Sequence, residues 1–200
     1  MPDSAYQLKT LAALDAAERV FARQGFGKAS MRDVAEAAGI SIAGLYYYLP
    51  SKRRALFLLC ERAFRQLLTR LDRALAQCHD PQGQLRVFVR GHLDFVIHHP
   101  SAFRVLLRDM DALEGDERAA VLELRRQYFA RAGDLVIAVQ QLALSGIETR
   151  VATAALFGMM NWTPMWHHEV DDRDAARLAE QMTQLFLHGV TTPSPSEVMT

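Results

Sequence analysis

The stretch SMRDVAEAAGISIAGLYYYLPSK, residues 30–52, decides the fold of the first third of this chain. Ser30 is a residue of the type that begins a helix, and Asp33 stands three positions later, the spacing of a reciprocal helix cap. Gly39 ends the first run, and Ser41 begins a second one. The stretch therefore predicts two short helices joined by a tight turn.

Three positions predict how these two helices pack. Ala35 offers a small side chain where the helices cross, and Gly39 tolerates the positive φ that the turn needs. Leu45 returns an apolar side chain onto the first helix. This is the spacing of a helix-turn-helix.

The second helix has the features of one that enters the major groove of DNA. Its first turn lacks bulk and charge, so that its backbone can approach the bases, and its far end is phenolic and basic. Groups around that turn are expected to position phosphates. The predicted base contacts are Ser41, Ile42, Ala43 and Gly44, and the predicted phosphate contacts are Lys28, Ser30, Tyr46, Tyr47, Tyr48 and Lys52. For Lys28, a solvated side chain explains the sequence equally well.

The segment GKASMRDVAEAAGISIAGLYYYLPSKRRAL, residues 27–56, resembles the DNA-binding segment of the tetracycline-repressor-like (TetR) transcriptional regulators. Leu49 departs from the family's usual Phe, and Ala55 from its usual Leu. The matching positions are Gly25, Phe26, Ser30, Val34, Ala35, Gly39, Ile40, Ser41, Leu45, Tyr46, Tyr48 and Lys52. The resemblance implies a regulator that binds a palindromic operator in double-stranded DNA and responds to a small-molecule effector.

The charge distribution agrees with a nucleic-acid-binding N-terminal part. The whole chain of 200 residues has a net charge of zero, but residues 1–54 hold 8 Lys or Arg against 5 Asp or Glu. No apolar run approaches the roughly 20 residues of a membrane span, and the N-terminus lacks a signal-peptide core. We therefore expect a cytoplasmic protein without a membrane partner.

Helical periodicity continues to the end of the chain, with no alternating strand pattern. Apolar spacing predicts a helix over 7–24 after a loose leader at 1–6, and a long helix from Ser51 to about Gln77. Later helices are predicted over 84–98, from Ser101 to Met110, 118–144, 148–168 and 172–191, with a polar link at 114–117. The prediction is an all-α fold of about nine helices: a three-helix helix-turn-helix domain at 1–54, an effector-binding and dimerisation domain at 55–192, and a flexible tail at 193–200.

The last two predicted helices carry faces suited to pairing with a second copy of the chain. Small residues on the first of them permit close approach, and an apolar stripe follows the second. The small residues are Ala154, Ala155 and Gly158, and the stripe is Leu178, Met182, Leu185 and Gly189. We expect a homodimer through these two helices, because two-fold pairing doubles a short recognition site. Packing of the same stripes inside one subunit is the alternative.

The segment LFGMMNWTPMWHHEV, residues 156–170, points to an effector pocket. Pro164 cannot donate to the carbonyl of Met160, so a helix through it would leave that carbonyl free beside two tryptophans. Thioethers and indoles line adaptable apolar pockets, although a core stripe explains single residues equally well. The predicted effector-binding residues are Phe88, His92, Phe95, Phe103, Tyr128, Met159, Asn161, Trp162 and Trp166.

This half also resembles a subgroup of the same family in which HPSAFRVLL, LRRQY and GMMNW…W segments recur, and several of whose members respond to acyl-CoA thioesters. The resemblance ends after Trp166, where this chain has His167, His168 and Glu169. Cations would have to hold the phosphates of such a thioester. The candidates are Arg104, Arg108, Arg125 and Arg126, for which a solvated face is the alternative.

Other classes of function find little support in the sequence. The adjacent pairs His98–His99 and His167–His168 lack the spacing of helical metal ligands, and no cofactor loop or catalytic motif is present. We therefore predict no cofactor, no metal and no catalytic residue. The function predicted is a repressor released from its operator by a small apolar effector. The alternatives are a thiol-responsive regulator using Cys60 or Cys78, and a helical enzyme or carrier.

Overall fold

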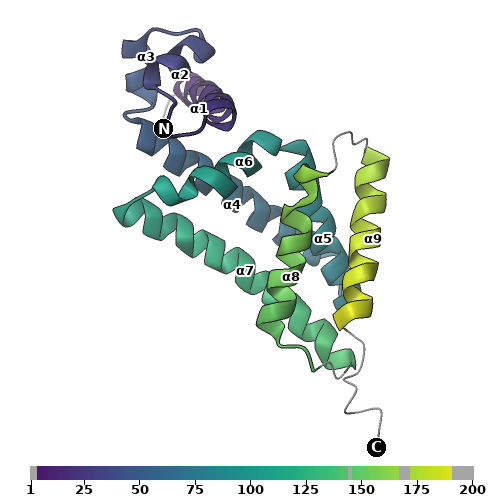
Figure 1. Cartoon of the computed structure of the whole chain (residues 1–200). Coiled ribbons are helices and arrows are strands. Elements are labelled where there is room, and N and C mark those ends of the chain that lie inside the picture. The colour runs from purple at the N-terminus through teal and green to yellow at the C-terminus, as the bar shows by residue number, and fades with distance from the viewer. Residues whose placement is uncertain (1–3, 144–145, 167–171, 191–200) are drawn as a thin grey trace, which may run out of the picture. The chain divides into compact units, whose positions relative to one another are not determined.

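In a computed structural model of the chain, the structure describes residues 4–143, 146–166 and 172–190. These residues form α-helices and two short 3-10 helices without a strand, which confirms the all-α prediction (Figure 1). The elements are α1 (Ser4–Gln24), α2 (Met31–Ala38), α3 (Ile42–Tyr48), α4 (Lys52–Leu75), α5 (Pro81–His98), α6 (Pro100–Asp109), η1 (Met110–Ala112), α7 (Gly115–Ala143), α8 (Thr149–Asn161), η2 (Thr163–Met165) and α9 (Asp172–Val190).

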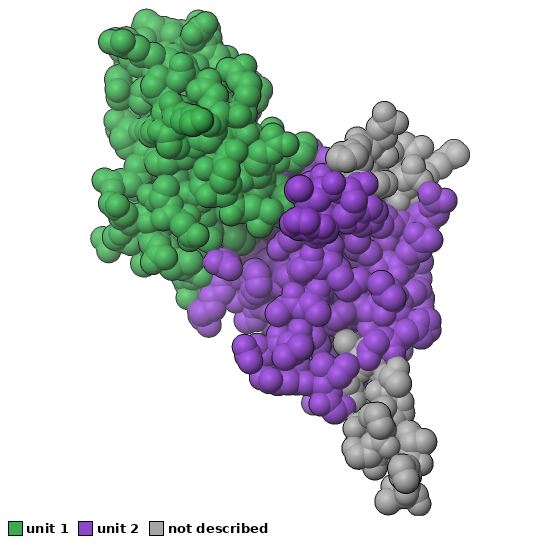
Figure 2. Space-filling model, viewed as in Figure 1, with its two compact units in different colours: residues 1–65, 100–124 green, residues 66–99, 125–200 purple. Residues whose placement is uncertain are grey.

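The chain divides into two compact units, coloured separately in Figure 2. Unit 1 comprises residues 1–65 and 100–124, and unit 2 comprises residues 66–99 and 125–200. Helices α4 and α7 each contribute residues to both units, because the division falls after residue 65 in α4 and after residue 124 in α7. The division by packing therefore differs from the functional division predicted at residue 54, because α6 packs against α1 inside unit 1.

The core of unit 1 forms where α1 meets α2, α3 and α6. Helices α2 and α3 have eight and seven residues, too few to be stable alone in water. They depend on burying Val34 and Leu45, both fully inaccessible, against the apolar face of α1 that includes Ala17 and Phe21. This packing fixes the orientation of α3.

Unit 2 is built around α5, which packs along α9 and also contacts α8 (Figure 1). Leu85, Phe88, Val89, Phe95 and Val96 form a nearly continuous buried surface on α5. These positions recur at the helical period, so they lie on one face of α5, which the neighbouring helices cover. Helix α5 is therefore the central element of this unit.

Several predicted helix boundaries were wrong by a few residues. Helix α1 begins at Ser4, so the predicted leader at 1–6 is too long. Helix α6 begins at Pro100 rather than after a cap at Ser101, because the first turn of a helix does not need the N–H that proline lacks. The predicted link at 114–117 belongs largely to α7, which begins at Gly115.

The predicted helix over 148–168 was also wrong at its end. Helix α8 stops at Asn161, where the N–H of Trp162 donates to the carbonyl of Gly158, and the 3-10 turn η2 follows. Pro164 lies in that turn, because proline disfavours the helical conformation of the residue before it. The proline thus ends the helix instead of leaving a defect inside it. Residues 167–168 and the predicted tail at 193–200 lie outside the described residues.

Candidate nucleic-acid interface and effector cavity

Helix α2 begins with the reciprocal cap that the sequence predicts. The N–H of Asp33 donates to Oγ of Ser30 (3.2 Å), while the N–H of Ser30 donates to Oδ2 of Asp33 (2.7 Å). The Ser30 hydroxyl also donates to Oδ2 (2.7 Å). The hydrogen bond from the Ser30 hydroxyl, and to a lesser extent that from its N–H, lowers the pKa of the Asp33 carboxyl. The Ser30 side chain is exposed beside this cap.

The turn between α2 and α3 depends on one glycine. Gly39 has φ 66°, and its N–H donates to the carbonyl of Glu36 (3.0 Å). The N–H of Ile40 reaches back to the carbonyl of Ala35 (3.1 Å). This arrangement closes the last turn of α2 and starts the chain toward α3.

Helix α3 is held on one side and exposed on the other. The hydroxyl of Ser41 accepts from the N–H of Gly44 (3.1 Å), and Leu45 is fully buried. Ser41, Ile42 and Ala43 are exposed at the first turn, with Gly44 half-buried beside them. All four predicted base contacts therefore lie at one end of a helix whose orientation is fixed from beneath.

Three tyrosines gather at the other end of α3, with a fourth from α1 that the sequence analysis missed. Tyr46 is exposed, and Tyr47 exposes 69% of its surface. Tyr6 lies with its ring 5.5 Å from that of Tyr47 and 5.4 Å from that of Tyr48. Tyr6 was assigned to a leader, and its position in the first turns of α1 brings it to this cluster.

Exposed cations lie on both sides of α3. Arg32, which the sequence analysis also missed, lines a surface recess together with Ile42 and Tyr46. Lys9 of α1 lines a second recess beside Ser41. Lys28 is exposed in the segment before α2. Arg32 could have been predicted to lie near DNA from its position in the first turn of α2, two residues after the Ser30 cap.

The structure gives Lys52 a contact that its sequence position did not suggest. Its ammonium donates to the carbonyls of Phe26 (2.8 Å) and Ala29 (2.9 Å) and lies 4.5 Å from the centre of the Phe26 ring. Lys52 therefore ties the start of α4 to the segment between α1 and α2. Its predicted phosphate contact stays a prediction, and two of its three N–H groups are already used inside unit 1.

The next two cations of α4 are paired with the start of α7. Arg53 contacts the Glu114 carboxylate at 2.6 Å, and Arg54 contacts Glu117 at 3.2 Å. Both arginines are half-exposed or more, so these pairs contribute little to stability. The pairs nevertheless neutralise two positive charges close to Lys52.

Helix α6 is tied to the end of α1 by two arginines once considered for phosphate binding. Arg108 donates to the carbonyl of Phe21 and to both oxygens of its neighbour Asp109. Arg104 donates to the carbonyl of Ala22 (3.5 Å). Cations at a helix C-terminus are favoured by its dipole. Both guanidinium groups are engaged within unit 1.

Unit 2 contains a cavity of about 520 Å³ lined by α4, α5, α7 and α9. Its apolar surface comes from Leu67, Leu71 and Phe88, and Tyr128 and His92 also line it. Three of the predicted effector residues, Phe88, His92 and Tyr128, are thus brought together.

A buried polar chain lies beneath this cavity. His92 Nδ1 is 3.0 Å from the Tyr128 hydroxyl, and Nε2 is 3.0 Å from Oδ1 of Asn161. Burial lowers the pKa of His92 to about 4, so the ring is neutral near neutral pH. Burial also raises the pKa of the Tyr128 hydroxyl. These two lining groups are therefore uncharged near neutral pH, and Asn161 holds the ring by its contact with Nε2.

The other predicted effector residues lie elsewhere. Phe95 is fully buried with its ring 5.3 Å from that of His99. Met159, Trp162 and Trp166 line a separate groove between α8 and α9, of about 420 Å³. Phe103 belongs to unit 1. Met159, Trp162 and Trp166 thus line a groove apart from His92, and their role in effector binding stays a prediction.

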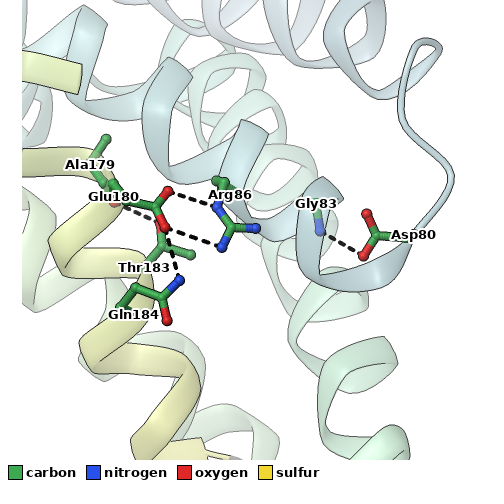
Figure 3. A network of polar contacts seen from close by, with 7 residues as sticks. All are labelled: Asp80, Gly83, Arg86, Ala179, Glu180, Thr183 and Gln184. Carbon is green, nitrogen blue, oxygen red and sulfur yellow. Dashed lines mark hydrogen bonds and ion pairs between the residues drawn. The ribbon is translucent and has the colours of Figure 1, made fainter. Parts of the chain in front are cut away.

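The cavity has a charged rim. Arg86 of α5 and Glu180 of α9 form a two-point ion pair, with Nε to Oε2 at 2.8 Å and Nη2 to Oε1 at 3.2 Å (Figure 3). Arg90 pairs with Asp94 at 2.9 Å on α5. Hydrogen bonding by Arg86, then by Gln184, lowers the pKa of Glu180. All the charged groups named here line the cavity.

The two cysteines are free. Burial, with a smaller contribution from Asp109, raises the pKa of the Cys60 thiol to about 12. The half-buried Cys78 lies after α4, with its sulfur 3.9 Å from the carbonyl and from a carboxylate oxygen of Asp80. Cys60 is therefore an uncharged, unreactive thiol near neutral pH.

Within residues 4–143, 146–166 and 172–190, no group of three or more His, Cys, Asp or Glu side chains could hold a metal ion. Across the same ranges, no helix has the length and apolarity needed to cross a membrane.

A capped two-helix unit with one exposed helix, joined in one chain to a helical unit with a cavity, is the architecture of ligand-responsive helix-turn-helix regulators. Residues 13–58 match the family model described as "Bacterial regulatory proteins, tetR family", and residues 78–190 match "Tetracyclin repressor-like, C-terminal domain". The chain belongs to the TetR family of bacterial regulatory proteins.

Individual relatives show the same pattern. The chain is 29% identical over 96 residues to the HTH-type transcriptional activator FasR of Mycolicibacterium smegmatis, covering 48% of this chain and 44% of FasR, so it spans less than half of that relative's length. It is 20% identical over 185 residues to the fatty acid metabolism regulator protein of Bacillus subtilis, and the match covers 91% of this chain and 95% of that protein. A crystal structure of a TetR-family transcriptional regulator from Bordetella parapertussis 12822 superposes on this chain with a TM-score of 0.82 at 29% identity. The match covers 89% of this chain and 93% of that chain.

Proposed function

We propose that this chain is a transcriptional regulator that binds a palindromic DNA operator as a homodimer and is released by a small apolar effector. One observation carries the proposal: α3 is fixed by the Ser41 cap and buried Leu45, while it exposes Ile42, Tyr46 and Tyr47. A helix supported in this way can present its outer side to a major groove. Such a regulator acts where the chromosome lies, in the cytoplasm.

The contacts follow from the exposed groups. Ser41, Ile42, Ala43 and Gly44 face base edges at the first turn of α3. Tyr46, Tyr47 and Tyr48, with Ser30 and the exposed cations Lys28 and Arg32, face phosphates. Lys52 supports this surface by holding the segment that contains Lys28.

The outer sides of α8 and α9 support a homodimer. Val151, Ala154, Ala155 and Gly158 are exposed along α8, and Trp162 exposes 63% of its surface. Leu185 on α9 exposes 68%. Apolar side chains left outside one subunit argue against packing within that subunit as their whole role. A second copy of the same two helices would cover them and double the DNA site.

The cavity of unit 2 is the proposed effector site. Its volume of about 520 Å³ falls in the usual range for small-molecule sites, and much of its lining is apolar. A relative named as a fatty acid metabolism regulator supports an effector with an apolar chain. Arg104 and Arg108 are engaged with α1, so the earlier assignment of these two cations to coenzyme A phosphates is not retained.

A thiol-responsive mechanism is the second candidate, and the structure disfavours Cys60 as its sensor because that thiol is buried with a raised pKa. If Cys78 were the sensor, Cys78→Ser would abolish release of DNA by oxidants. An effector mechanism predicts that Cys78→Ser leaves release unchanged.

Selection of binding sites from a random duplex library tests the proposal. The wild-type chain should enrich an inverted repeat, and Leu185→Asp should be monomeric by light scattering and bind at least tenfold more weakly. Leu142→Asp, an equally exposed leucine on α7, is the control and should remain dimeric. Enrichment of no sequence, or an unchanged dimer in Leu185→Asp, contradicts the corresponding part of the proposal.

A further inference from the structure

The rim and the walls of the unit 2 cavity differ in chemistry. Leu67, Leu71 and Phe88 give the walls an apolar surface, and the buried His92 is neutral. The charged groups belong to the rim: the arginines 70, 86 and 90 and the carboxylates of residues 94 and 180. An apolar space with charge at one edge suits a molecule that has both characters.

We propose that the cavity binds an amphipathic organic anion, an apolar body with one carboxylate head, and that Glu180 occupies the position of that head on Arg86 until the ligand replaces it. The inference rests on the proposed function only in taking this cavity as the effector site. It adds the chemical class of the effector and the group that recognises it.

The geometry of Arg86 and Glu180 supports an exchange of carboxylates. The guanidinium presents two N–H groups to the two oxygens of Glu180, at 2.8 and 3.2 Å (Figure 3). This paired arrangement is the one in which arginine recognises any carboxylate. The Glu180 carboxylate is also held by Nε2 of Gln184 at 2.8 Å, so it has a second partner on α9 when it leaves Arg86.

The pair is accessible enough to be replaced. The Arg86 side chain exposes 38% of its surface and that of Glu180 exposes 48%. Ion pairs with this much exposure are weakened by water and contribute little to stability. A ligand that brings a carboxylate with an apolar body gains burial of that body, which Glu180 cannot offer. The exchange is therefore favourable for an amphipathic anion and unfavourable for a small polar one.

The charge balance of the rim also favours an anion. Three arginines face two carboxylates, since Arg86 pairs with Glu180 and Arg90 with Asp94. The third guanidinium, that of Arg70, lies 3.3 Å from Nε2 of His99. A single negative charge on a ligand would match the three guanidinium groups of the rim with three negative charges.

Calorimetric titration with octanoate and with 1-octanol tests the proposal, because the two probes share an eight-carbon chain and differ in charge. The wild-type chain should bind octanoate more tightly than 1-octanol. Glu180→Gln removes the competing charge and keeps the shape, so octanoate should bind about 5-fold more tightly, with 1-octanol unchanged. Arg86→Gln should weaken octanoate about 10-fold or more and leave 1-octanol unchanged.

Two further variants separate recognition from folding. Glu148→Gln breaks an exposed Glu148–Arg150 pair outside the cavity lining and should bind both probes as the wild type does. Arg86→Lys keeps the charge without the two-point geometry and should bind octanoate between wild type and Arg86→Gln. All variants should melt within about 3 °C of the wild type, since the pair is exposed.

Equal binding of the two probes, no binding of octanoate, or tighter octanoate binding in Arg86→Gln would overturn the proposal. A separate titration with operator DNA distinguishes this failure from failure of the proposed function. A chain that binds DNA but shows no Arg86-dependent octanoate binding remains a regulator with another effector class. A chain that shows the octanoate pattern and binds no DNA keeps the anion site and loses the regulator.

Discussion

Lys52→Met tests whether Lys52 mainly supports the DNA-binding surface or contacts DNA directly. The substitution keeps the apolar stem and removes the ammonium that donates to the Phe26 and Ala29 carbonyls at 2.8 and 2.9 Å. A buried hydrogen bond from a charged group contributes about 1.5–3 kcal/mol, and partial exposure reduces each to about 1 kcal/mol. The expected loss is therefore about 2 kcal/mol, or about 4–8 °C in the melting temperature of a chain this size.

Thermal melting by circular dichroism measures this loss, and DNA titrations over about 50 to 200 mM salt measure the number of phosphates contacted. Arg32→Met is the matched comparison, because Arg32 is exposed beside Ile42 and Tyr46. It should melt as the wild type does and lower the salt slope by about 0.9 per subunit, or about 1.8 for the bound dimer. Lys52→Met should lower the melting temperature and keep the slope. A normal melting temperature with a slope lowered by about 1.8 for the dimer would show that Lys52 is a phosphate ligand and that its bonds to the two carbonyls contribute nothing.

Three further outcomes follow from the same contacts. Leu45→Ala should reduce the free energy of unfolding by about 2–5 kcal/mol, measured by urea titration, because Leu45 is fully buried; a loss below about 1 kcal/mol would contradict its role in holding α3. The double variant Glu114→Gln, Glu117→Gln should bind DNA more tightly and with a steeper salt slope, because Arg53 and Arg54 lose their competing carboxylates; an unchanged slope would show that these cations lie away from the phosphates. His92 is protonated near pH 6.5 in the unfolded chain and near pH 4 in the folded chain, so its contribution to stability is full above about pH 6.5. About 3 kcal/mol of the free energy of unfolding is lost as the pH falls to about 4. Urea titrations of His92→Gln should lack this part of the pH dependence, and an identical dependence in both proteins would contradict the burial of a neutral ring.

Local signals in the sequence predicted the helix-turn-helix well. The caps at Ser30 and Ser41 and the turn at Gly39 depend on groups within four residues of each other, so spacing alone specifies them. The family resemblance added the regulator class, which the family models support. Short-range capping is therefore the part of the site that sequence predicts most directly.

Long-range contacts were the part that spacing could not predict. The ammonium of Lys52 bonds to the carbonyls of residues 23 and 26 positions earlier, and nothing in its neighbours indicates this. Tyr6 was missed for the same reason, since its partners Tyr47 and Tyr48 lie on another helix. Such contacts depend on how α1 packs against α3.

The predicted effector residues on α8 were separated by the geometry of the helix itself, not by long-range packing. Met159 and Asn161 are two positions apart, which places them about 200° apart around a helix. Asn161 therefore faces His92, while Met159 lies in the outer groove with Trp162. The helical period therefore separates these two residues. Pro164 also ended the helix that the prediction had continued.

The measurement that tests the central claim most directly is a fluorescence anisotropy titration of DNA flanking the chain's own coding region with three proteins. Wild type should bind in a saturable and salt-dependent manner. Ile42→Asp should bind at least tenfold more weakly, because it places a negative charge on the exposed side of α3. Leu107→Asp makes the same change at an exposed position of α6 and should bind as the wild type does. Equal binding by all three proteins, or salt-insensitive binding by the wild type, would contradict the assignment of α3 as the helix that reads DNA.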